Sequence, residues 1–330
     1  MSDYIIATSS TADLPRTWLD AHAVPFIPYS FTINDQAAQD DCREESRAAI
    51  YAGMRRGDVL KTSMINEFQY SEFFRELLQT GKDVIFLDMS KEMSASYQNS
   101  ENAAESVRAE FPDRRLYVMD TRCISGGLGT LVVNMVRRME SGASFEEVIA
   151  WGEANKLKIA HRFTVDDLNY LKAGGRVSNA SALVGSLLSI KPVLYVPDRG
   201  TLDVVKKARG RKTALHTIRD GILHDLAKID PSGTEFHILH ADCQADAEYI
   251  RDEIRRAYPQ VGEITITQLG VVIGAHCGPG LMALDHVLDQ RAETAGDAEG
   301  VHDIKLLPGK LRAHLLGRLD GVLKGDRHLL

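Results

Sequence analysis

Serine and threonine side chains recur in short loops that follow apolar runs of the sequence. Such hydroxyls hydrogen-bond an anion without burying a full counter-charge. Several of the loops lead into predicted helices, whose free N–H groups and positive dipole end also favour an anion. Each hydroxyl taken alone is equally typical of a helix cap or a turn. Together they predict an anion site, and the set is Ser9, Ser10, Thr11, Thr62, Ser63, Ser94 and Ser125.

Two further side chains have the chemistry of anion recognition. Arg176 follows Gly174 and Gly175, which close a short predicted helix. Its guanidinium is a rigid bidentate donor suited to a carboxylate or a phosphate. His276 lies just before a turn that contains Pro279, where its side chain can face a crevice. Taken alone, Arg176 fits a surface ion pair and His276 a satisfied turn histidine.

The first half of the chain predicts an open α/β sheet that positions these loops. Apolar runs rich in Ile, Val, Phe and Tyr are apolar on both faces and alternate with helical patterns, which is typical of parallel strands covered on two sides. In an open α/β sheet a ligand binds at the carboxyl ends of the strands, where the hydroxyl loops fall. The predicted strands are 4–8, 24–33, 84–89 and 116–120, and the predicted helices are 66–80 and 94–111.

From about residue 156 the pattern changes to that of half-exposed strands. Residues 158–165 alternate, with Ile159, Phe163 and Val165 on one face. The strongest helical stripe lies at 244–258, where Asp242 is the expected N-cap. Hairpins and helices together indicate a mixed α+β domain. The further predicted strands are 193–196, 202–207, 235–241 and 263–269, the first two joined by a turn at 197–200.

The fold class is therefore α/β, with two domains. An N-terminal domain of open, mostly parallel α/β sheet spans residues 1–155, with 270–284 returning to it. A mixed α+β domain spans 156–269. Residues 285–330 form a linker and a short basic amphipathic helix carrying Leu311, Leu315, Leu319 and Leu323. This helix docks on the body, pairs with another subunit or lies at a membrane surface, and its glycines favour the first two.

Composition narrows the function further. The chain has 330 residues, of which 44% are hydrophobic and 26% charged, as in an ordinary globular protein. Its formal net charge of −7 argues against nucleic acid as a partner. No apolar stretch is long enough to span a membrane, and the first residues lack a signal-peptide pattern, so a cytoplasmic location is expected. The four cysteines are far apart, and we interpret them as reduced thiols.

Common cofactor and catalytic motifs are missing from the sequence. There is no phosphate-binding loop of the G-x-x-x-x-G-K-[ST] type, no G-x-G-x-x-G, no H-E-x-x-H and no G-x-S-x-G. His237 and His240 lie three apart on a predicted strand, which points them to opposite faces and disfavours a metal pair. We therefore predict no catalytic residues, no metal and no cofactor.

In combination, the motifs resemble the DegV family of bacterial fatty-acid-binding proteins over about residues 4 to 284. Each segment is weak alone, but their order along the chain is specific. The matching segments are 10–15, 62–63, 93–98, 120–121 with 125–129, 166–171, 174–178, 190–194, 207–212 and 276–280.

The resemblance implies a long-chain fatty acid held between two α/β domains, with its tail in an apolar tunnel. It implies that Thr62, Ser63, Ser94, Ala95 and His276 bind the carboxylate, that Arg176 lies near the mouth, and that Ser9, Ser10, Thr11 and Ser125 are further hydroxyls. Some members load the ligand for a fatty-acid kinase, in which a separate protein phosphorylates the carboxylate to an acyl phosphate for phospholipid metabolism. Such a member is not itself a catalyst, and it makes transient membrane contact at most.

Several residues depart from the usual family pattern. Met64 and Ile65 stand where Gln and Pro are common, and Ser9 where Asp is common. Glu92 precedes the Ser94 loop, and its carboxylate would repel a ligand anion unless it points to solvent.

Two other functions stay open. The first is an acyl hydrolase or transferase with Ser94 as nucleophile and His276 as base. The second is a regulatory protein that acts by contacts through the C-terminal basic helix and residues 206–212.

Overall fold

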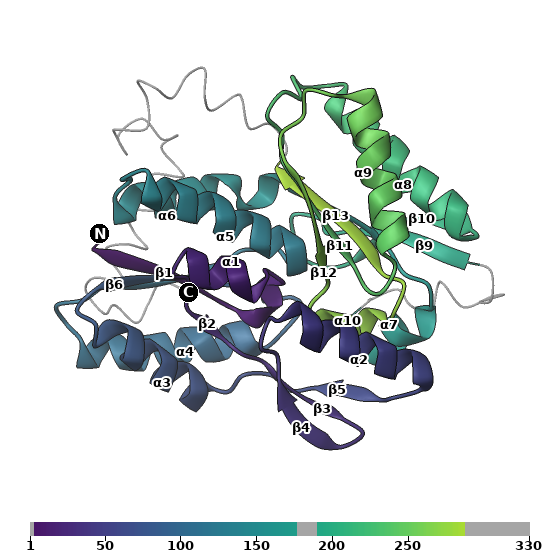
Figure 1. The fold of residues 1–330 in the computed structure, drawn as a ribbon. Coiled ribbons are helices and arrows are strands. Elements are labelled where there is room, and N and C mark those ends of the chain that lie inside the picture. The colour runs from purple at the N-terminus through teal and green to yellow at the C-terminus, as the bar shows by residue number, and fades with distance from the viewer. Residues whose placement is uncertain (1–2, 177–189, 288–330) are drawn as a thin grey trace.

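A computed structural model describes residues 3–176 and 190–287. The predicted basic helix of the C-terminal tail and residues 177–178 of the arginine motif lie outside this range. The described chain forms a four-stranded, a six-stranded and a three-stranded sheet. In Figure 1 the two larger sheets stand side by side, each packed against helices. The α/β class with a parallel sheet and a mixed sheet is confirmed.

The four-stranded sheet is parallel throughout and has the order β2-β1-β6-β7. The strands predicted at 4–8, 84–89 and 116–120 form within one residue at each end. Every residue of β6 is buried, as expected for a strand covered on two faces. The strands are β1 (Tyr4–Ser9), β2 (Phe26–Ile27), β6 (Asp83–Asp88) and β7 (Leu116–Asp120).

The predicted strand 24–33 is wrong as one element, because it divides at Pro28. Phe26–Ile27 pairs with β1, whereas Ser30–Ile33 pairs with strands of the small sheet. Proline has no N–H to donate to a ladder, so the chain leaves one sheet there and enters another. The small sheet has the order β4-β3-β5, with β3 (Ser30–Ile33), β4 (Gln36–Gln39) and β5 (Leu60–Thr62).

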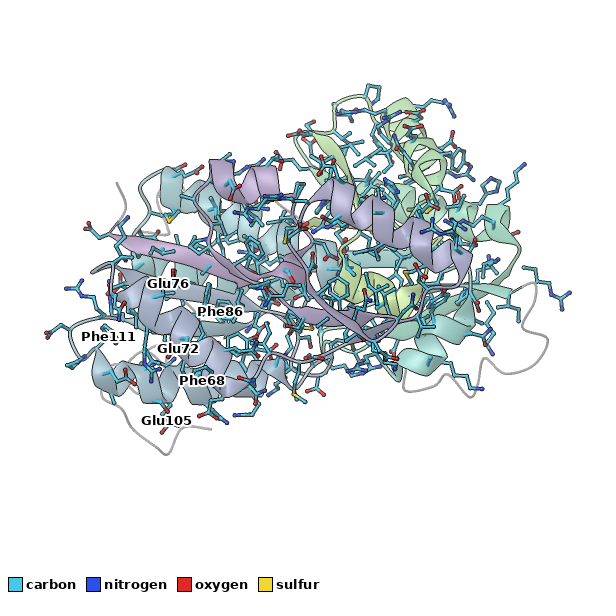
Figure 2. The ribbon with its side chains drawn as sticks, turned by 60° about the horizontal axis from the view of Figure 1, so that its bottom comes forward. Phe68, Glu72, Glu76, Phe86, Glu105 and Phe111 are labelled. Carbon is cyan, nitrogen blue, oxygen red and sulfur yellow. The ribbon has the colours of Figure 1, made fainter. Side chains whose placement is uncertain are left out.

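Helices cover both faces of the parallel sheet (Figure 1). On one side lie α3 (Glu67–Leu78) and α4 (Ser96–Glu110), and on the other α5 (Ser125–Glu140) and α6 (Phe145–Asn155). A capping box begins α3, where Asn66 and Gln69 bond reciprocally. In Figure 2 Phe68, Glu72 and Glu105 lie on the outer surface of α3 and α4, while the buried Phe86 lies beneath them.

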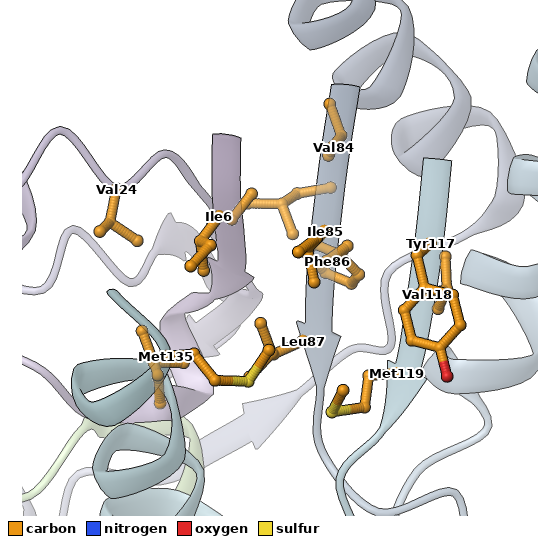
Figure 3. Close-up of a cluster of buried hydrophobic side chains, with 14 of the residues drawn as sticks. Ile6, Val24, Val84, Ile85, Phe86, Leu87, Tyr117, Val118, Met119 and Met135 are labelled. Atoms are coloured by element: carbon orange, nitrogen blue, oxygen red, sulfur yellow. The ribbon is translucent and has the colours of Figure 1, made fainter. Parts of the chain in front are cut away.

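Apolar side chains of three strands and a helix fill the space within these layers. In Figure 3 Ile6, Leu87, Met119 and Met135 come together from β1, β6, β7 and α5. All four are almost fully buried. This packing fixes where the strands end, and therefore where their loops begin.

The six-stranded sheet has the order β10-β9-β8-β13-β11-β12. It is antiparallel except for the parallel pair β11 and β12. The mixed sheet predicted for the second half of the chain is thus confirmed. Its strands are β8 (Ile159–Thr164), β9 (Ile190–Tyr195), β10 (Asp203–Arg209), β11 (Phe236–His240), β12 (Ile264–Gln268) and β13 (Met282–Val287).

This sheet has a helix-covered outer face and an inner face toward the rest of the molecule. Met282 and Leu284 of β13 pack with residues of α8 (Arg211–Leu226) and α9 (Gln244–Ala257). On the inner face, α5 contacts β8, β11 and β13 while also contacting strands of the parallel sheet. The helix α5 therefore links the two sheets.

Two details differ from the predictions for this region. β13 lies between β8 and β11, so residues from 282 onward do not return to the N-terminal domain as predicted. The sheet that β13 joins is determined by its pairing with β8 and β11, which are distant in the sequence. The sequence of one strand does not show which strands it pairs with. Asp242 is not the cap of α9, because its carboxylate pairs with Arg55, and Cys243 is the N-cap residue.

The remaining elements vary in length. They are η1 (Ser10–Ala12), α1 (Arg16–Ala21), α2 (Glu44–Arg56), η2 (Lys156–Lys158), α7 (Leu168–Gly174) and α10 (Val271–Cys277). α7 and α10 contact each other, and α10 also contacts β5. Within the described residues, no helix is both long and apolar enough to cross a bilayer.

Candidate functional site

A cavity of about 220 Å³ lies between the two larger sheets. Its volume far exceeds the roughly 10–15 Å³ that one water molecule needs. The wall is mostly apolar and is formed by segments from all over the chain. The apolar lining residues are Met64, Met89, Met93, Ile124, Phe163, Leu171, Leu202, Leu269, Val272, Ile273, Leu281 and Ala283.

Thr62 and His276 form a hydrogen-bonded pair on the cavity wall. Thr62 ends β5, His276 lies on α10, and Oγ1 is 2.8 Å from Nε2. The histidine ring lies against the end of α7, where a Cβ at Gly174 would be 2.6 Å from its Nδ1. The predicted glycine thus allows α7 and α10 to approach closely.

His276 is uncharged at neutral pH. Burial, and then the positive charge of Arg176, together lower the pKa of its imidazole to about 4. A neutral imidazole has one donor and one acceptor nitrogen, and which one faces Thr62 depends on the tautomer. The pair therefore offers hydrogen bonds to a ligand without adding a charge.

Arg176 supplies the positive charge near this pair. Its side chain is exposed and also lines the cavity. The guanidinium donates to the carbonyl of Gly174 at 2.6 Å and contacts the carbonyl of Met93 at 3.5 Å. Arg176 thus connects the end of α7 to the loop that carries Ser94.

Ser94 and Tyr29 place two more hydroxyls at the cavity. Oγ of Ser94 accepts a hydrogen bond from the N–H of Ser96 at the start of α4. The Tyr29 hydroxyl lies close to Ser94 and Ser96, but it is buried and makes no hydrogen bond of normal geometry to the described residues. Burial, and then the charge of Asp88, raises the pKa of Tyr29, so its hydroxyl keeps its proton. A buried tyrosine hydroxyl without a partner is suited to a polar ligand group.

Tyr29 was not predicted from the sequence. It follows Pro28, where the chain passes between sheets, and Oγ of Ser10 accepts a hydrogen bond from its N–H. The sequence feature that could have indicated Tyr29 is a tyrosine, whose hydroxyl is polar, next to a proline in an otherwise apolar run.

The structure brings together some of the other predicted residues and leaves others apart. Ser63 and Ser125 line the cavity. Ala95 is exposed, and the described lining does not include it. Ser9, Ser10 and Thr11 are buried in the protein interior instead: Ser9 bonds Thr11, and Ser10 holds the Tyr29 backbone. The sequence predicts these three as further hydroxyls of the ligand site, whereas the hydrogen bonds of their side chains lie within the protein.

Glu92 points away from the site. Its side chain is exposed, lies 3.7 Å from the guanidinium of Arg122 and is not among the described lining residues. It therefore brings no negative charge to the Ser94 hydroxyl.

Ser125 belongs to a separate buried polar group. Its hydroxyl donates to the carboxylate of Asp13 at 2.5 Å. Burial raises the pKa of Asp13 to about 7, against the opposing effects of Arg47 and Ser125. The buried Arg47 donates to the carbonyls of Asp13 and Leu14. This group holds the loop after β1 against the start of α5.

His161 and Asp285 form a second polar pair on the wall, which sequence reasoning missed. They are opposite each other on β8 and β13, and Nδ1 is 2.8 Å from Oδ1. His161 lies at the alternate position between Ile159 and Phe163, so a histidine on an apolar strand face was the available signal.

The cavity wall also carries the Cys277 thiol, together with the Ser94 and His276 side chains of the hydrolase alternative. Burial raises the pKa of Cys277 to about 12, so this lining thiol stays protonated. Ser94 accepts from the backbone of Ser96, whereas His276 bonds Thr62. The serine and histidine required by a hydrolase therefore have other partners.

Comparisons with known proteins agree on one family. The model of an uncharacterised-protein family, the DegV family, matches residues 4–287. A DegV domain-containing protein of Clostridium perfringens is 37% identical over 287 residues, covering 86% of this chain and 97% of its own length. Another, of Streptococcus pyogenes, is 31% identical and covers 85% and 96%.

Two solved structures extend the comparison to the fold. A DegV family protein of Thermus thermophilus, described as binding fatty acid, has a TM-score of 0.76 at 28% identity, covering 88% of this chain and all of its own. A Thermotoga maritima protein, described as revealing fatty-acid-binding function, has a TM-score of 0.73 at 26% identity with the same coverage.

Proposed function

The chain belongs to the DegV family, and on this basis we propose that it binds one long-chain fatty acid in the cavity between its sheets. The observation that carries the proposal is an apolar cavity with a cluster of uncharged hydrogen-bonding groups and one arginine on its wall. We define the head-group cluster as Tyr29, Thr62, Ser94, Arg176 and His276.

The head-group cluster fits a carboxylate. Hydroxyls and a neutral imidazole stabilise the anion by hydrogen bonds, and the partly solvated guanidinium of Arg176 adds attraction without a buried ion pair. The lining side chains include one acid, Asp285, which lies on β13 rather than beside the cluster. The distribution of charge therefore favours the carboxylate at Arg176 and the tail toward β13.

The apolar wall fits the tail. Moving one methylene from water into the cavity lowers the free energy by about 0.8 kcal/mol. A long chain therefore gains roughly 10 kcal/mol of binding free energy before the entropy lost on binding is subtracted. A bilayer offers a tail the same apolar surroundings. Selective uptake from a membrane must then depend on the head-group cluster and on the shape of the cavity.

We extend the proposal to a partner. The bound carboxylate is presented to a separate fatty-acid kinase, which transfers the γ-phosphoryl group of ATP to a carboxylate oxygen and releases ADP. Exposed residues at one side of the cavity, Ser63, Met64 and Arg176, would face such a partner. Transient contact with a cytoplasmic membrane surface would supply the ligand.

Calorimetric titration of delipidated protein with stearate and with methyl stearate tests the proposal. Both ligands carry the same tail, but only stearate has the anion. We expect saturable binding at one site, with stearate bound at least tenfold more tightly. The double variant Ser94→Ala with His276→Ala should lose most of this preference. Equal affinity for acid and ester would refute the head-group assignment, and hydrolysis of the ester would indicate the acyl hydrolase instead.

A further inference from the structure

The His161–Asp285 pair on the wall of the fatty-acid cavity has hydrogen-bonding atoms without partners among the described residues. Both side chains line the cavity, and each is only 4% exposed. One imidazole nitrogen and one carboxylate oxygen bond each other. The other two atoms, Nε2 of His161 and Oδ2 of Asp285, have no hydrogen-bond partner among the described residues. Buried polar atoms in this condition are rare and call for an explanation.

The pair lies on the part of the cavity wall that β8 and β13 form, whereas the head-group cluster comes from other segments of the chain. Alternate residues of β13 face the cavity, and Leu281, Ala283 and Asp285 all line it. Leu281 follows the turn after α10, which carries His276. Asp285 lies four positions after Leu281, about 13 Å along an extended chain at roughly 3.3 Å per residue. Ala283 and its partner Phe163 form the apolar wall between.

The start of α5 fixes the pair in place. A Cβ at Gly127 would be 1.7 Å from Cε1 of His161, and one at Gly126 would be 2.4 Å from Oδ2 of Asp285. The two glycines let the helix backbone lie directly against both side chains. Neither side chain is therefore free to turn away from its position.

The unused atoms define the group that would fit them. Because Nδ1 faces a carboxylate, it carries a proton, and Nε2 is then an acceptor in the neutral ring or a donor in the charged one. A hydroxyl has one proton and two acceptor lone pairs. Beside the charged ring it accepts from Nε2 while donating to Oδ2, and beside the neutral ring it donates to one of the two atoms. A carboxylate is disfavoured there by the charge of Asp285.

On the basis of the proposed function, we propose that His161 and Asp285 recognise a hydroxyl group on the distal part of the acyl chain. The ligand class is then a hydroxylated long-chain fatty acid, with its carboxylate at the head-group cluster and its hydroxyl at β13. A plain saturated chain would place methylenes against the unused polar atoms and leave them without a partner.

Titrations with stearate, 12-hydroxystearate and 2-hydroxystearate test this. One added hydrogen bond predicts that 12-hydroxystearate binds about three- to tenfold more tightly than stearate. 2-Hydroxystearate, whose hydroxyl lies beside the carboxylate, should show no such gain. If stearate binds as well as 12-hydroxystearate, the pair holds an ordered water only and the inference is wrong.

Variants of the pair complete the test. His161→Phe with Asp285→Leu replaces both partners together and avoids a lone buried charge. It should bind stearate at least as well as the natural protein does, and should lose the gain for 12-hydroxystearate. The control Phe163→Leu changes the neighbouring apolar wall and should keep the gain. A gain retained in the double variant would place hydroxyl recognition elsewhere.

The two proposals fail in different ways. No saturable binding of stearate by the natural protein would refute the fatty-acid function, and this inference with it. Stearate binding without a positional hydroxyl preference would refute this inference alone. If the double variant does not fold, the comparison of the 2- and 12-hydroxy isomers in the natural protein decides.

Discussion

Oγ1 of Thr62 and Nε2 of His276 lie 2.8 Å apart, although 214 positions separate the two residues in the sequence. Their hydrogen bond joins the end of β5 to α10 at the cavity. With His276 neutral and Arg176 close by, the two side chains can turn toward an anion and exchange their mutual bond for bonds to it. Under the proposed function, this pair supplies two of the hydrogen-bonding groups of the head-group cluster.

Replacing Thr62 by valine should weaken fatty-acid binding. The change removes one hydroxyl and keeps the shape of the side chain, so we expect a three- to tenfold rise in Kd for stearate. Thr62→Ser, which keeps the hydroxyl, is the control and should stay within twofold of the natural protein. Calorimetric titration measures both. An unchanged Kd for Thr62→Val would remove this residue from the cluster.

Replacing Arg176 by methionine should lower the affinity and its dependence on salt. The guanidinium is exposed, so its attraction for a carboxylate is screened and we expect only a two- to fivefold effect at low salt. Arg176→Lys keeps the charge and should keep most of the salt dependence. Titrations at two ionic strengths test this. If the Kd of the natural protein for stearate is the same at both ionic strengths, the charge of Arg176 has no role in binding.

His276 should make stability depend on pH in a defined direction. Its folded-state pKa of about 4 is below the usual 6.5, so between these values the unfolded state binds more protons. Above pH 6.5, His276 is neutral in both the folded and the unfolded state and does not lower the free energy of unfolding. As the pH falls from 6.5 toward 4, the free energy of unfolding decreases by up to about 3 kcal/mol because of this histidine. Asp13 and Asp88, with raised pKa values, act in the opposite direction over much of this range.

A comparison with His276→Gln isolates this effect, because the carboxyl groups are common to both proteins. Urea unfolding from pH 4 to 8 should show the natural protein losing stability relative to the variant only below about pH 6.5. Parallel profiles over the whole range would mean that His276 titrates normally.

Gly127→Ala should destabilise the protein although it lies in a helix. Alanine in a helix interior is normally better than glycine by about 1 kcal/mol. Here the new Cβ would overlap the ring of His161, which Asp285 holds in place, so we expect a net loss of about 1–3 kcal/mol. Gly221→Ala in α8 is the control, because it meets only the flexible guanidinium of Arg162, at 3.1 Å. Thermal unfolding measures the melting temperature of both variants. Equal melting temperatures would contradict the close contact between the backbone at Gly127 and the ring of His161.

Much of the fold could be predicted from local patterns. Buried strands such as β6 and β7 have apolar runs that a sequence displays directly, and α3 has its cap and its apolar stripe in one segment. The position of β13 could not be predicted in this way. It depends on pairing with β8 and β11, which are far away in the sequence.

The candidate site likewise contains residues that could be predicted from the sequence and residues that could not. Thr62, Ser94, Arg176 and His276 belong to recognisable segments, and all four line one cavity. His161 and Asp285 meet only through the register of β8 with β13, and Tyr29 only through the break of the chain at Pro28. The hydroxyls of Ser9, Ser10 and Thr11 show the converse. Their hydroxyl groups predicted contact with a ligand, whereas the hydrogen bonds that these groups make are to other residues inside the protein.

Native mass spectrometry of the purified protein tests the central claim most directly, because it weighs the protein together with any bound ligand. Our account predicts a single mass increment equal to one long-chain fatty acid, either retained through purification or restored by adding stearate to delipidated protein. A protein that stays at its unliganded mass in the presence of excess stearate would contradict the account.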